Sequence, residues 1–235
     1  MKIELIKKPK NVTIIEGFPG FGLVGTITTE YLIDHLKAEK IGRIFFHDMT
    51  PLVAVHDGKV VEPIGIFYDQ KNKIVILHAL ADVKGKEWVI ANALIDLCKQ
   101  LDAKEMISVE GVGGVGTKGS NAYYYSKNKR WQNLGIEQLK EGVVIGVTAA
   151  MLAGSSDKKS KVSCVFAETK SNLPDSRAAA KVIEVLDKYL GLSVDYKPLI
   201  KKADDFEGKI KDFVSKSKKV INKSKANKEA LNYLG

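Results

Sequence analysis

The sequence predicts an α/β fold, a three-layer sandwich in which a largely parallel sheet lies between two layers of helices. Three observations predict this fold. Short apolar runs have the length of buried strands, longer segments have the apolar periodicity of amphipathic helices, and the two kinds alternate along the chain. With 235 residues, 45% of them hydrophobic, the chain can bury one core of ordinary size. Alternation of strands and helices is typical of a sheet that is covered by helices.

In the first half of the chain, the apolar pattern switches repeatedly between strand and helix. We expect strands at 12–16, 43–48, 64–69 and 73–79, and helices at 26–38 and 84–103. The last two of these strands form a hairpin around Asp69 to Asn72. The longer helix has an apolar face that we expect to lie on the core, formed by Trp88, Ala91, Ile95, Leu97 and Leu101.

The second half repeats the alternation. We expect buried strands at 105–111 and 162–168, a short helical run at 131–140, and a buried strand in 142–154 that continues directly into a helix of small residues. The last helix, 174–191, carries its own boundary signals. Pro174 stands at its first turn, Asp175 near the positive end of its dipole, and Gly191 at its end.

The composition changes near residue 197, which divides the chain into an α/β domain (1–196) and a C-terminal tail (197–235). The tail is a lysine-rich amphipathic helix followed by a flexible end. It holds 11 lysines and 5 acidic residues, so it carries six of the nine net positive charges. It has no arginine and does not interleave its lysines with aromatic residues, so we expect a solvated helix face and no nucleic-acid binding.

Composition also excludes several classes of protein. No apolar run has membrane-spanning length, and the first ten residues lack the apolar core of a signal peptide, so we expect a soluble, cytoplasmic protein that does not bind membranes. The two cysteines, Cys98 and Cys164, are far apart, and no histidine has metal-ligand spacing. We therefore expect both cysteines to be buried small hydrophobic residues, and no bound metal.

A glycine-rich segment, Gly17 to Gly25, follows the first buried strand and leaves two interpretations open. Gly20, Gly22 and Gly25 match the G-x-G-x-x-G fingerprint of dinucleotide-binding folds, and Asp48 ends the next strand near the position of a ribose-binding acid. The alternative is that the glycines allow positive φ angles and close helix-to-sheet packing. Phe18, Pro19 and Phe21 favour this alternative, because phenyl rings at the turn suit packing or a contact surface better than a phosphate site.

A second glycine-rich segment, 111–126, is a near match to a P-loop. Gly111 and Gly116 have the required spacing, but Thr117 and Lys118 stand in the reverse order. The exchange rotates the lysine by about 100° around any helix that follows, away from the terminal phosphates. The segment therefore predicts no ATP site.

Catalytic signatures are absent from the rest of the sequence. There is no G-x-S-x-G elbow, and no serine or cysteine is coupled to a histidine by sequence. The four histidines are scattered, which favours structural roles: His35, His47, His56 and His78. Glu110 and Glu168 end two strands of the parallel type, where open α/β sheets bind ligands, so they are the carboxylates to test if the protein is an enzyme.

Four motifs in order resemble the proteasome assembly chaperone family, in particular its archaeal homologues. They are "GFPGFGLVGTITTEYLIDHL", "EGVGG" after a strand, "GVTAAMLA" and "LPDSRAAAKVIEVLDKYLGL", and the resemblance covers about residues 10 to 192. It implies a fold akin to that of purine nucleoside phosphorylase, no catalysis, no cofactor, and binding to the α-subunits of the 20S proteasome. Some members have been labelled ATP-grasp enzymes, but the segments described above supply no nucleotide loop that supports this label.

The tail carries two further signals. Its apolar positions alternate in steps of four and three, the heptad pattern of paired helices, at Leu199, Ala203, Phe206, Ile210, Phe213, Ser217 and Val220. Such a helix either pairs with other copies, which makes the protein a homo-oligomer, or folds back on its own domain. With Phe18 and Phe21 of the first loop, we expect Phe206, Ile210 and Phe213 to form the oligomer or contact surface.

The chain end is the second signal. Archaeal homologues that this chain resembles are thought to bind the proteasome through a terminal hydrophobic-Tyr-X motif. Here the end reads Leu231, Asn232, Tyr233, Leu234, Gly235, so the tyrosine is third from last instead of penultimate and the motif is a variant. The resemblance implies that Leu231, Tyr233, Leu234 and Gly235 contact the α-ring.

Overall fold

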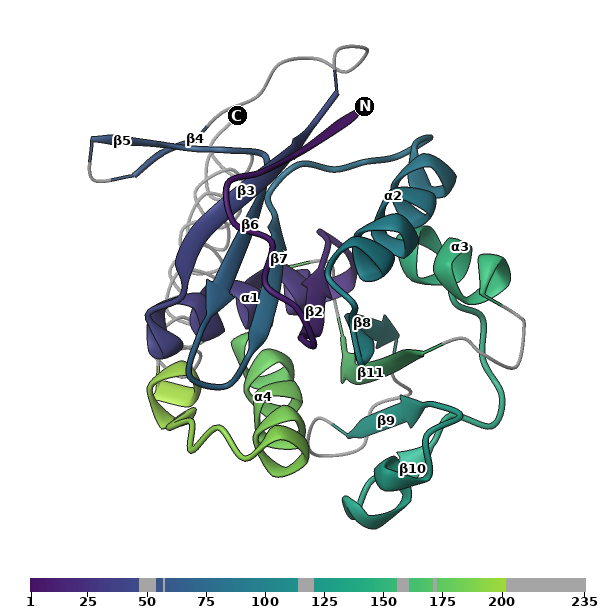
Figure 1. Cartoon of the computed structure of the whole chain (residues 1–235). Helices are drawn as coiled ribbons and strands as arrows, with labels where there is room; N and C mark the ends of the chain where they lie inside the picture. Colours follow the sequence, from purple (N-terminus) through teal and green to yellow (C-terminus); the bar gives the residue numbers. More distant parts are fainter. Residues whose placement is uncertain (47–53, 57, 114–120, 156–160, 171–172, 202–235) are drawn as a thin grey trace, which may run out of the picture.

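A nine-stranded sheet forms the centre of the protein (Figure 1). The computed structural model describes residues 1–46, 54–56, 58–113, 121–155, 161–170 and 173–201. The strands of the main sheet are β1 (Lys2–Leu5), β2 (Thr13–Gly17), β3 (Glu39–Phe45), β6 (Ile64–Asp69), β7 (Ile74–Ala79), β8 (Glu105–Gly113), β9 (Ala122–Tyr125), β10 (Glu137–Gln138) and β11 (Val162–Thr169). The helices are α1 (Val24–Leu36), α2 (Glu87–Gln100), α3 (Gly146–Gly154) and α4 (Ser176–Leu190), with short 3₁₀ turns η1 (Phe21–Leu23) and η2 (Lys129–Asn133).

The sheet is mixed, with parallel strands at its centre. Its order is β1-β3-β6-β7-β2-β8-β11-β9-β10, and β4 (Ala54–His56) and β5 (Lys59–Val61) form a separate hairpin. The neighbours β7, β2, β8 and β11 are parallel to one another. The pairs β1–β3, β3–β6, β6–β7 and β11–β9 are antiparallel. The expectation of a largely parallel sheet therefore holds for the four central strands and is wrong for the flanks.

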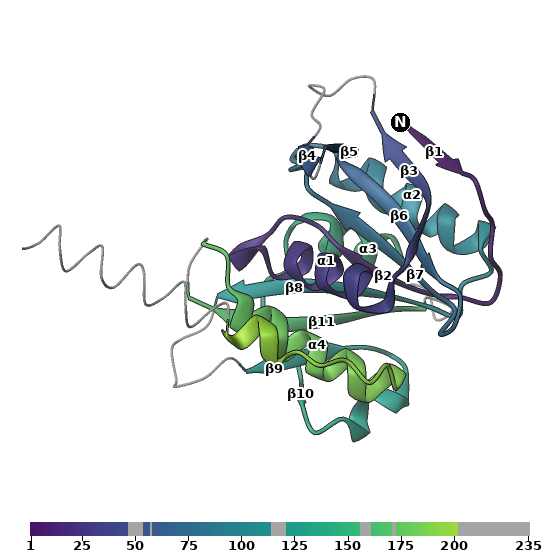
Figure 2. The same cartoon turned by 90° about the vertical axis from the view of Figure 1, so that its left-hand side faces the viewer.

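Helices cover both faces of the central strands, which gives the expected three layers. Figures 1 and 2 show α1 and α4 on one side of the sheet and α2 and α3 on the other. The alternation of side chains along β2 divides the core accordingly: Ile15 packs with the α1 and α4 side, and Ile14 with the α2 and α3 side. Both side chains are fully buried, which explains why this strand reads as a continuous apolar run.

Three local expectations are wrong. The run 142–145 is not a strand, and its Val143 and Ile145 are 88% and 72% exposed. The segment 131–140 is not a helix beyond the turn η2, because it continues into the short strand β10. Trp88 faces solvent with 59% of its surface exposed, since the buried stripe of α2 runs through Ile90, Ala91, Ala93, Leu94 and Leu97.

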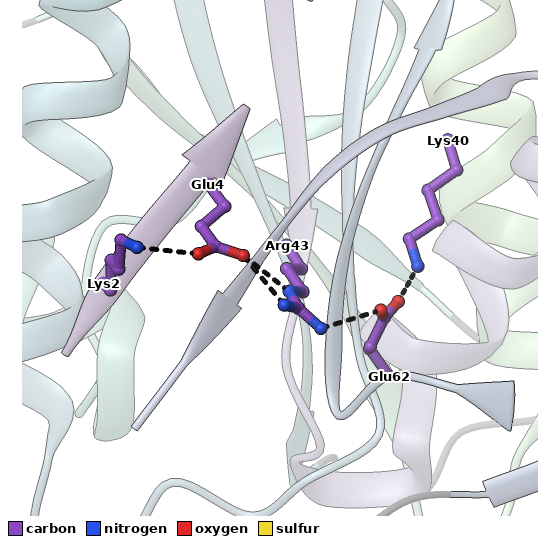
Figure 3. A network of polar contacts seen from close by, with 5 residues as sticks. All are labelled: Lys2, Glu4, Lys40, Arg43 and Glu62. Carbon is purple, nitrogen blue, oxygen red and sulfur yellow. Dashed lines mark hydrogen bonds and ion pairs between the residues drawn. The ribbon is translucent and has the colours of Figure 1, made fainter. Parts of the chain in front are cut away.

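A chain of alternating charges runs across the outer strands of the sheet (Figure 3). Arg43 of β3 contacts Glu4 of β1 at 2.9 Å and Glu62 at 3.5 Å. Lys2 extends the chain at Glu4, and Lys40 extends it at Glu62. Hydrogen bonds from Lys2 and Arg43 hold the pKa of Glu4 below its usual value. Exposed pairs of this kind contribute little to stability, but charged side chains at a sheet edge discourage pairing with another chain.

Candidate functional site

The glycine-rich segment after β2 lies at the carboxyl edge of the parallel strands, where α/β folds place their binding sites. The space beside its glycines is occupied by other protein atoms. A Cβ atom on Gly17 would lie 2.3 Å from the carbonyl oxygen of Gly25, and one on Gly25 would lie 2.6 Å from that of Val109. A Cβ on Gly111, at the end of β8, would lie 2.0 Å from the carbonyl oxygen of Phe21. These glycines thus let the loop and the start of α1 approach β2 and β8.

Gly22 is the residue of this loop whose backbone itself requires glycine. Its φ is +66°, and a Cβ there would lie 2.7 Å from the hydroxyl of Thr169. The same position is tied to α4, because the Asp175 N–H donates to the Gly22 carbonyl at 2.9 Å. The Asp175 side chain accepts from the Thr169 hydroxyl at 2.7 Å and from the Ala178 N–H at 2.9 Å. Asp175 therefore joins the loop, the end of β11 and the first turn of α4.

The two phenylalanines of the loop have different environments. Phe18 is only 9% exposed and packs in the core on the α2 and α3 side. Phe21 is half-buried, at the start of η1. The inward position of Phe18 means that, of the two rings, Phe21 is the one with surface open to a partner.

The geometry argues against the dinucleotide alternative. Gly22 occupies the position of the fingerprint that a pyrophosphate would approach, and it packs instead against the Thr169 side chain. A Cβ on Gly20 would lie 3.4 Å from the Glu110 carboxylate, an acidic group that disfavours a bound phosphate. Asp48, the expected ribose-binding acid, lies outside the described residues.

Beneath the loop, two carboxyl groups and two hydroxyl groups form a buried cluster. Glu16 of β2 is 1% exposed and lies opposite Ser108 of β8 in the strand register. The Ser108 and Thr148 hydroxyls are 2.7 Å apart, which joins β8 to α3, and Glu110 follows Ser108 by two residues on the same face of β8. Oε1 of Glu16 and Oε2 of Glu110 are buried and have no hydrogen-bond partner.

Burial controls the titration of this cluster. It raises the pKa of Glu16 to about 8, with the nearby Glu110 adding to the rise and Ser108 opposing it. Burial also raises the pKa of Glu110 to about 7, against the hydrogen bond from Thr148. The Cys164 thiol has a raised pKa because it is buried and close to both carboxyl groups. A thiol held in its neutral form is a poor nucleophile, so the geometry agrees with a structural Cys164.

The other titratable candidates also have structural environments. Glu168 does not join the cluster, because it accepts from Tyr123 at 2.8 Å and from Asn121 at 3.1 Å. His78 is buried against Thr29 at 2.9 Å, and burial lowers its pKa to about 4. Burial raises the pKa of Cys98 to about 12. A histidine that stays neutral and hydrogen-bonded serves packing better than general-base chemistry at neutral pH.

Exposed apolar side chains gather on elements that begin or end at this edge. Trp88 and Val89 lie in the first turn of α2, and Val143 and Ile145 lie just before α3. Leu173, between β11 and α4, is 59% exposed. Their exposure could not be predicted from the sequence, because apolar runs indicate burial, whereas these side chains face outward. An apolar edge of this kind suits protein contact.

The structure also bears on metals, membranes and the tail. Within the described ranges, no group of three or more His, Cys, Asp or Glu residues could hold a metal ion. No helix in those ranges is long and apolar enough to cross a membrane. The tail residues expected to make contacts lie outside the described part of the chain: Phe206, Ile210, Phe213, Leu231, Tyr233, Leu234 and Gly235.

Fold and site together define a three-layer α/β domain with a closely packed glycine loop where related folds hold a nucleotide. The chain belongs to the PAC2 family, whose model matches residues 14–214. A crystal structure of Pyrococcus furiosus PbaA, described as an archaeal homologue of proteasome-assembly chaperone, is similar to this chain at a TM-score of 0.84 and 29% identity, over 97% of this chain and 98% of that one.

Other relatives agree. Pyrococcus furiosus PbaB, described as an archaeal proteasome activator, shares the fold at a TM-score of 0.77 and 19% identity, over 90% of this chain and 98% of that one. An uncharacterized protein of Methanocaldococcus jannaschii is 29% identical over 223 residues, covering 92% of this chain and 91% of the relative. These matches span almost the whole length of each chain.

Proposed function

We propose that this protein is a non-catalytic proteasome-binding factor or assembly chaperone that contacts the α-ring of the 20S proteasome, partly through its C-terminal tail. The observation that carries the proposal is the likeness to PbaA, which covers nearly all of both chains at 29% identity. Membership of the PAC2 family points the same way. The family resemblance adds the expectation of a purine nucleoside phosphorylase-like architecture, and the composition adds that of a cytoplasmic location; both stay predictions.

The geometry of the carboxyl edge supports a binding role over an enzymatic one. Gly22, the glycine that a pyrophosphate would approach, packs against the Thr169 side chain, and the carboxylate near Gly20 disfavours phosphate. Burial lowers the pKa of His78 and raises the pKa of both cysteines, which disfavours their use in proton transfer or as nucleophiles. Exposed apolar residues lie on the elements of this edge, as in a protein that presents a surface to a partner.

The chain end supplies the groups that a pocket on an α-ring can use. The carboxylate of Gly235 suits a lysine, and Tyr233 offers a ring and a hydroxyl beside the apolar Leu231 and Leu234. A charge-assisted contact to the carboxylate contributes about 1.5–3 kcal/mol, and an aromatic anchor contributes about 2 kcal/mol. Each contact alone therefore changes the affinity by roughly ten- to a hundredfold.

Co-sedimentation with a cognate α-ring tests the tail mechanism. We expect deletion of Leu231 to Gly235 to abolish most binding while the folded domain and the oligomeric state stay intact. Tyr233→Ala should reproduce much of this loss, and extra residues added after Gly235 should weaken binding, since they move the carboxylate without changing any side chain. Asn227→Ala, in the same polar tail, is the matched control and should bind normally.

Two results would contradict the proposal at different levels. If the truncated protein binds the ring as tightly as the full chain, the tail mechanism is wrong and the contact lies on the α/β domain. If neither protein binds a cognate α-ring at micromolar concentrations and low salt, the proteasome-binding function itself is wrong.

A further inference from the structure

Glu16, Ser108, Thr148 and Glu110 form a cluster where α3 meets β2 and β8. Glu16 lies opposite Ser108 in the strand register, and Glu110 follows Ser108 by two residues on the same face of β8. The Ser108 and Thr148 hydroxyls are 2.7 Å apart. Oε1 of Glu16 and Oε2 of Glu110 are buried and have no hydrogen-bond partner. A buried carboxylate oxygen without a donor or a cation is unfavourable, so at least one of the two carboxyl groups carries a proton.

Among the described residues, no cation replaces this proton. The titratable groups in and around the cluster are Glu16 on β2, Glu110 on β8 and Cys164 on β11. The neighbouring strand β7 places Leu77 beside Glu16, and α3 contributes only the Thr148 hydroxyl. The residues of α2 on this face are apolar: Ile90, Ala91, Leu94 and Leu97. Full ionisation would leave two carboxylates close together in an apolar environment, which is unfavourable.

The cluster lies between two segments of the carboxyl edge. Glu16 directly precedes the loop that begins at Gly17, and the Glu110 carboxylate lies 3.4 Å from the Cβ position of Gly20. The same carboxylate lies 4.0 Å from the Cβ position of Gly146, the first residue of α3. A change of charge on the carboxyl groups of the cluster therefore acts on the loop and on the start of α3 together.

We propose that the cluster of Glu16, Ser108, Thr148 and Glu110 is a proton-dependent latch. One proton held by its two carboxyl groups keeps the glycine loop and the start of α3 in place, and loss of that proton loosens this edge. The N-terminus of α3 favours the charged form of Glu110, so the proton resides mainly on Glu16. The latch concerns the α/β domain and does not depend on the tail or on the proteasome.

The pKa values fix the direction of the effect. Both carboxyl groups have folded-state pKa values, about 8 for Glu16 and about 7 for Glu110, above the usual value of 4.5. The folded protein then binds more protons than the unfolded chain between about pH 4.5 and pH 8, so stability falls as the pH rises through this window. The stabilisation is complete below the unfolded pKa and lost above the folded one.

Urea unfolding of the full chain, measured from pH 5.5 to pH 9, tests the latch. We expect the midpoint of the wild type to fall across this range. Glu16→Gln and Glu110→Gln each keep the shape of a neutral carboxyl group but cannot ionise, so each should reduce the slope, and the double variant should remove most of it. Glu39→Gln changes an exposed carboxylate that pairs with Lys7, so it should keep the wild-type slope.

Hydrogen exchange at the same pH values locates the effect. After correction for intrinsic rates, residues 17–24 and 145–149 of the wild type should exchange about tenfold or more faster at pH 9 than at pH 6, whereas the double Gln variant should show no such change. Carbon-13 NMR of the Glu carboxyl groups provides a readout that needs no variant. It should show one carboxyl group that stays protonated at pH 7.

Three results would overturn the latch. The first is an equal pH slope for the wild type and the double Gln variant. The second is a carboxyl spectrum in which every glutamate is ionised at pH 6. The third is stabilisation by millimolar Ca²⁺, Mg²⁺ or Mn²⁺ that Glu16→Gln abolishes, because the cluster would then hold a metal ion in place of a proton. Loss of α-ring binding by tail deletion has no bearing on any of them.

Discussion

Gly111 and Gly113 stand two residues apart on β8 in different surroundings. A Cβ on Gly111 would lie 2.0 Å from the carbonyl oxygen of Phe21, whereas one on Gly113 would meet only the Phe21 ring at 4.0 Å. The first contact involves backbone that is held by η1 and α1, so it cannot be relieved by a side-chain rotation. Gly111 therefore provides a position at which close packing can be tested, and Gly113 on the same strand provides its control.

We expect Gly111→Ala to lower the free energy of unfolding by about 2–4 kcal/mol, because the loop must move away from β8. Gly113→Ala should change it by less than about 0.5 kcal/mol. Urea unfolding measures both values. Equal stability of the two variants would show that the loop yields easily, and close packing would then not explain the glycines.

Two buried glutamates show how surroundings decide the role of a carboxyl group. Glu105 accepts from the Trp131 indole at 2.9 Å, from Ser163 and from the Tyr189 hydroxyl at 2.5 Å. Its oxygens are thus satisfied by three donors, and it joins β8 to η2 and α4. Glu16 has one unpaired oxygen instead. A buried carboxyl oxygen without a donor favours the protonated form of its group, and the latch depends on this property of Glu16.

At the scale of elements, α4 shows how one capping residue positions a segment that is distant in sequence. Asp175 caps the helix through Ala178 and also holds the Gly22 carbonyl and the Thr169 hydroxyl. The helix ends at Gly191, whose φ is +70°. The end at Gly191 was expected from the sequence, whereas Pro174 and Asp175 were expected inside the first turn and instead precede the helix, with Asp175 as its N-cap. The contact with Gly22 was not expected.

We expect Asp175→Ala to lower the free energy of unfolding by about 1–2 kcal/mol, through loss of the cap and of the Thr169 contact. Because the Asp175 backbone also binds Gly22, hydrogen exchange should increase in residues 20–24 as well as in the first turn of α4. Lys188→Gln, at an exposed position of the same helix, is the control, with an expected loss of less than about 0.5 kcal/mol. An unchanged loop in Asp175→Ala would show that the loop is held independently of the cap.

The whole molecule is proposed to be a homo-oligomer, through the heptad positions of the tail or the loop around Phe21. The structure places Leu199, the first heptad position, in the core of its own domain at 4% exposure. The later positions lie outside the described residues. The first position thus follows the folded-back alternative, and the pairing of the later ones stays a prediction.

Light scattering decides between the two surfaces. Phe206→Asp combined with Phe213→Asp places two charges in the seam, each unfavourable to bury without a partner. If the tail assembles the oligomer, the mass of this variant should fall to that of a monomer. A mass that stays above the monomer and equals that of the wild type would show that the tail is not the assembly element, and Phe21 would become the next residue to replace.

Much of the fold was predictable from the sequence because local periodicity reports which side of an element is buried. The hairpin of β6 and β7, the helix α4 with its terminal glycine, and the alternation of the central strands with helices were all expected. The short edge strands β1 and β10 and the exposed run at Val143 were not, because their pairing or exposure depends on neighbours that are distant in sequence.

The sequence by itself determined the central strands and the main helices, their order along the chain, and the glycine signature that marks the family. Only the tertiary structure decided the directions of the flanking strands, since an apolar pattern is the same for a parallel and an antiparallel neighbour. It also decided that Glu16, Ser108, Thr148 and Glu110 meet. These residues come from three elements up to 132 positions apart in the chain, and the packing of α3 on the sheet brings the Thr148 hydroxyl to Ser108.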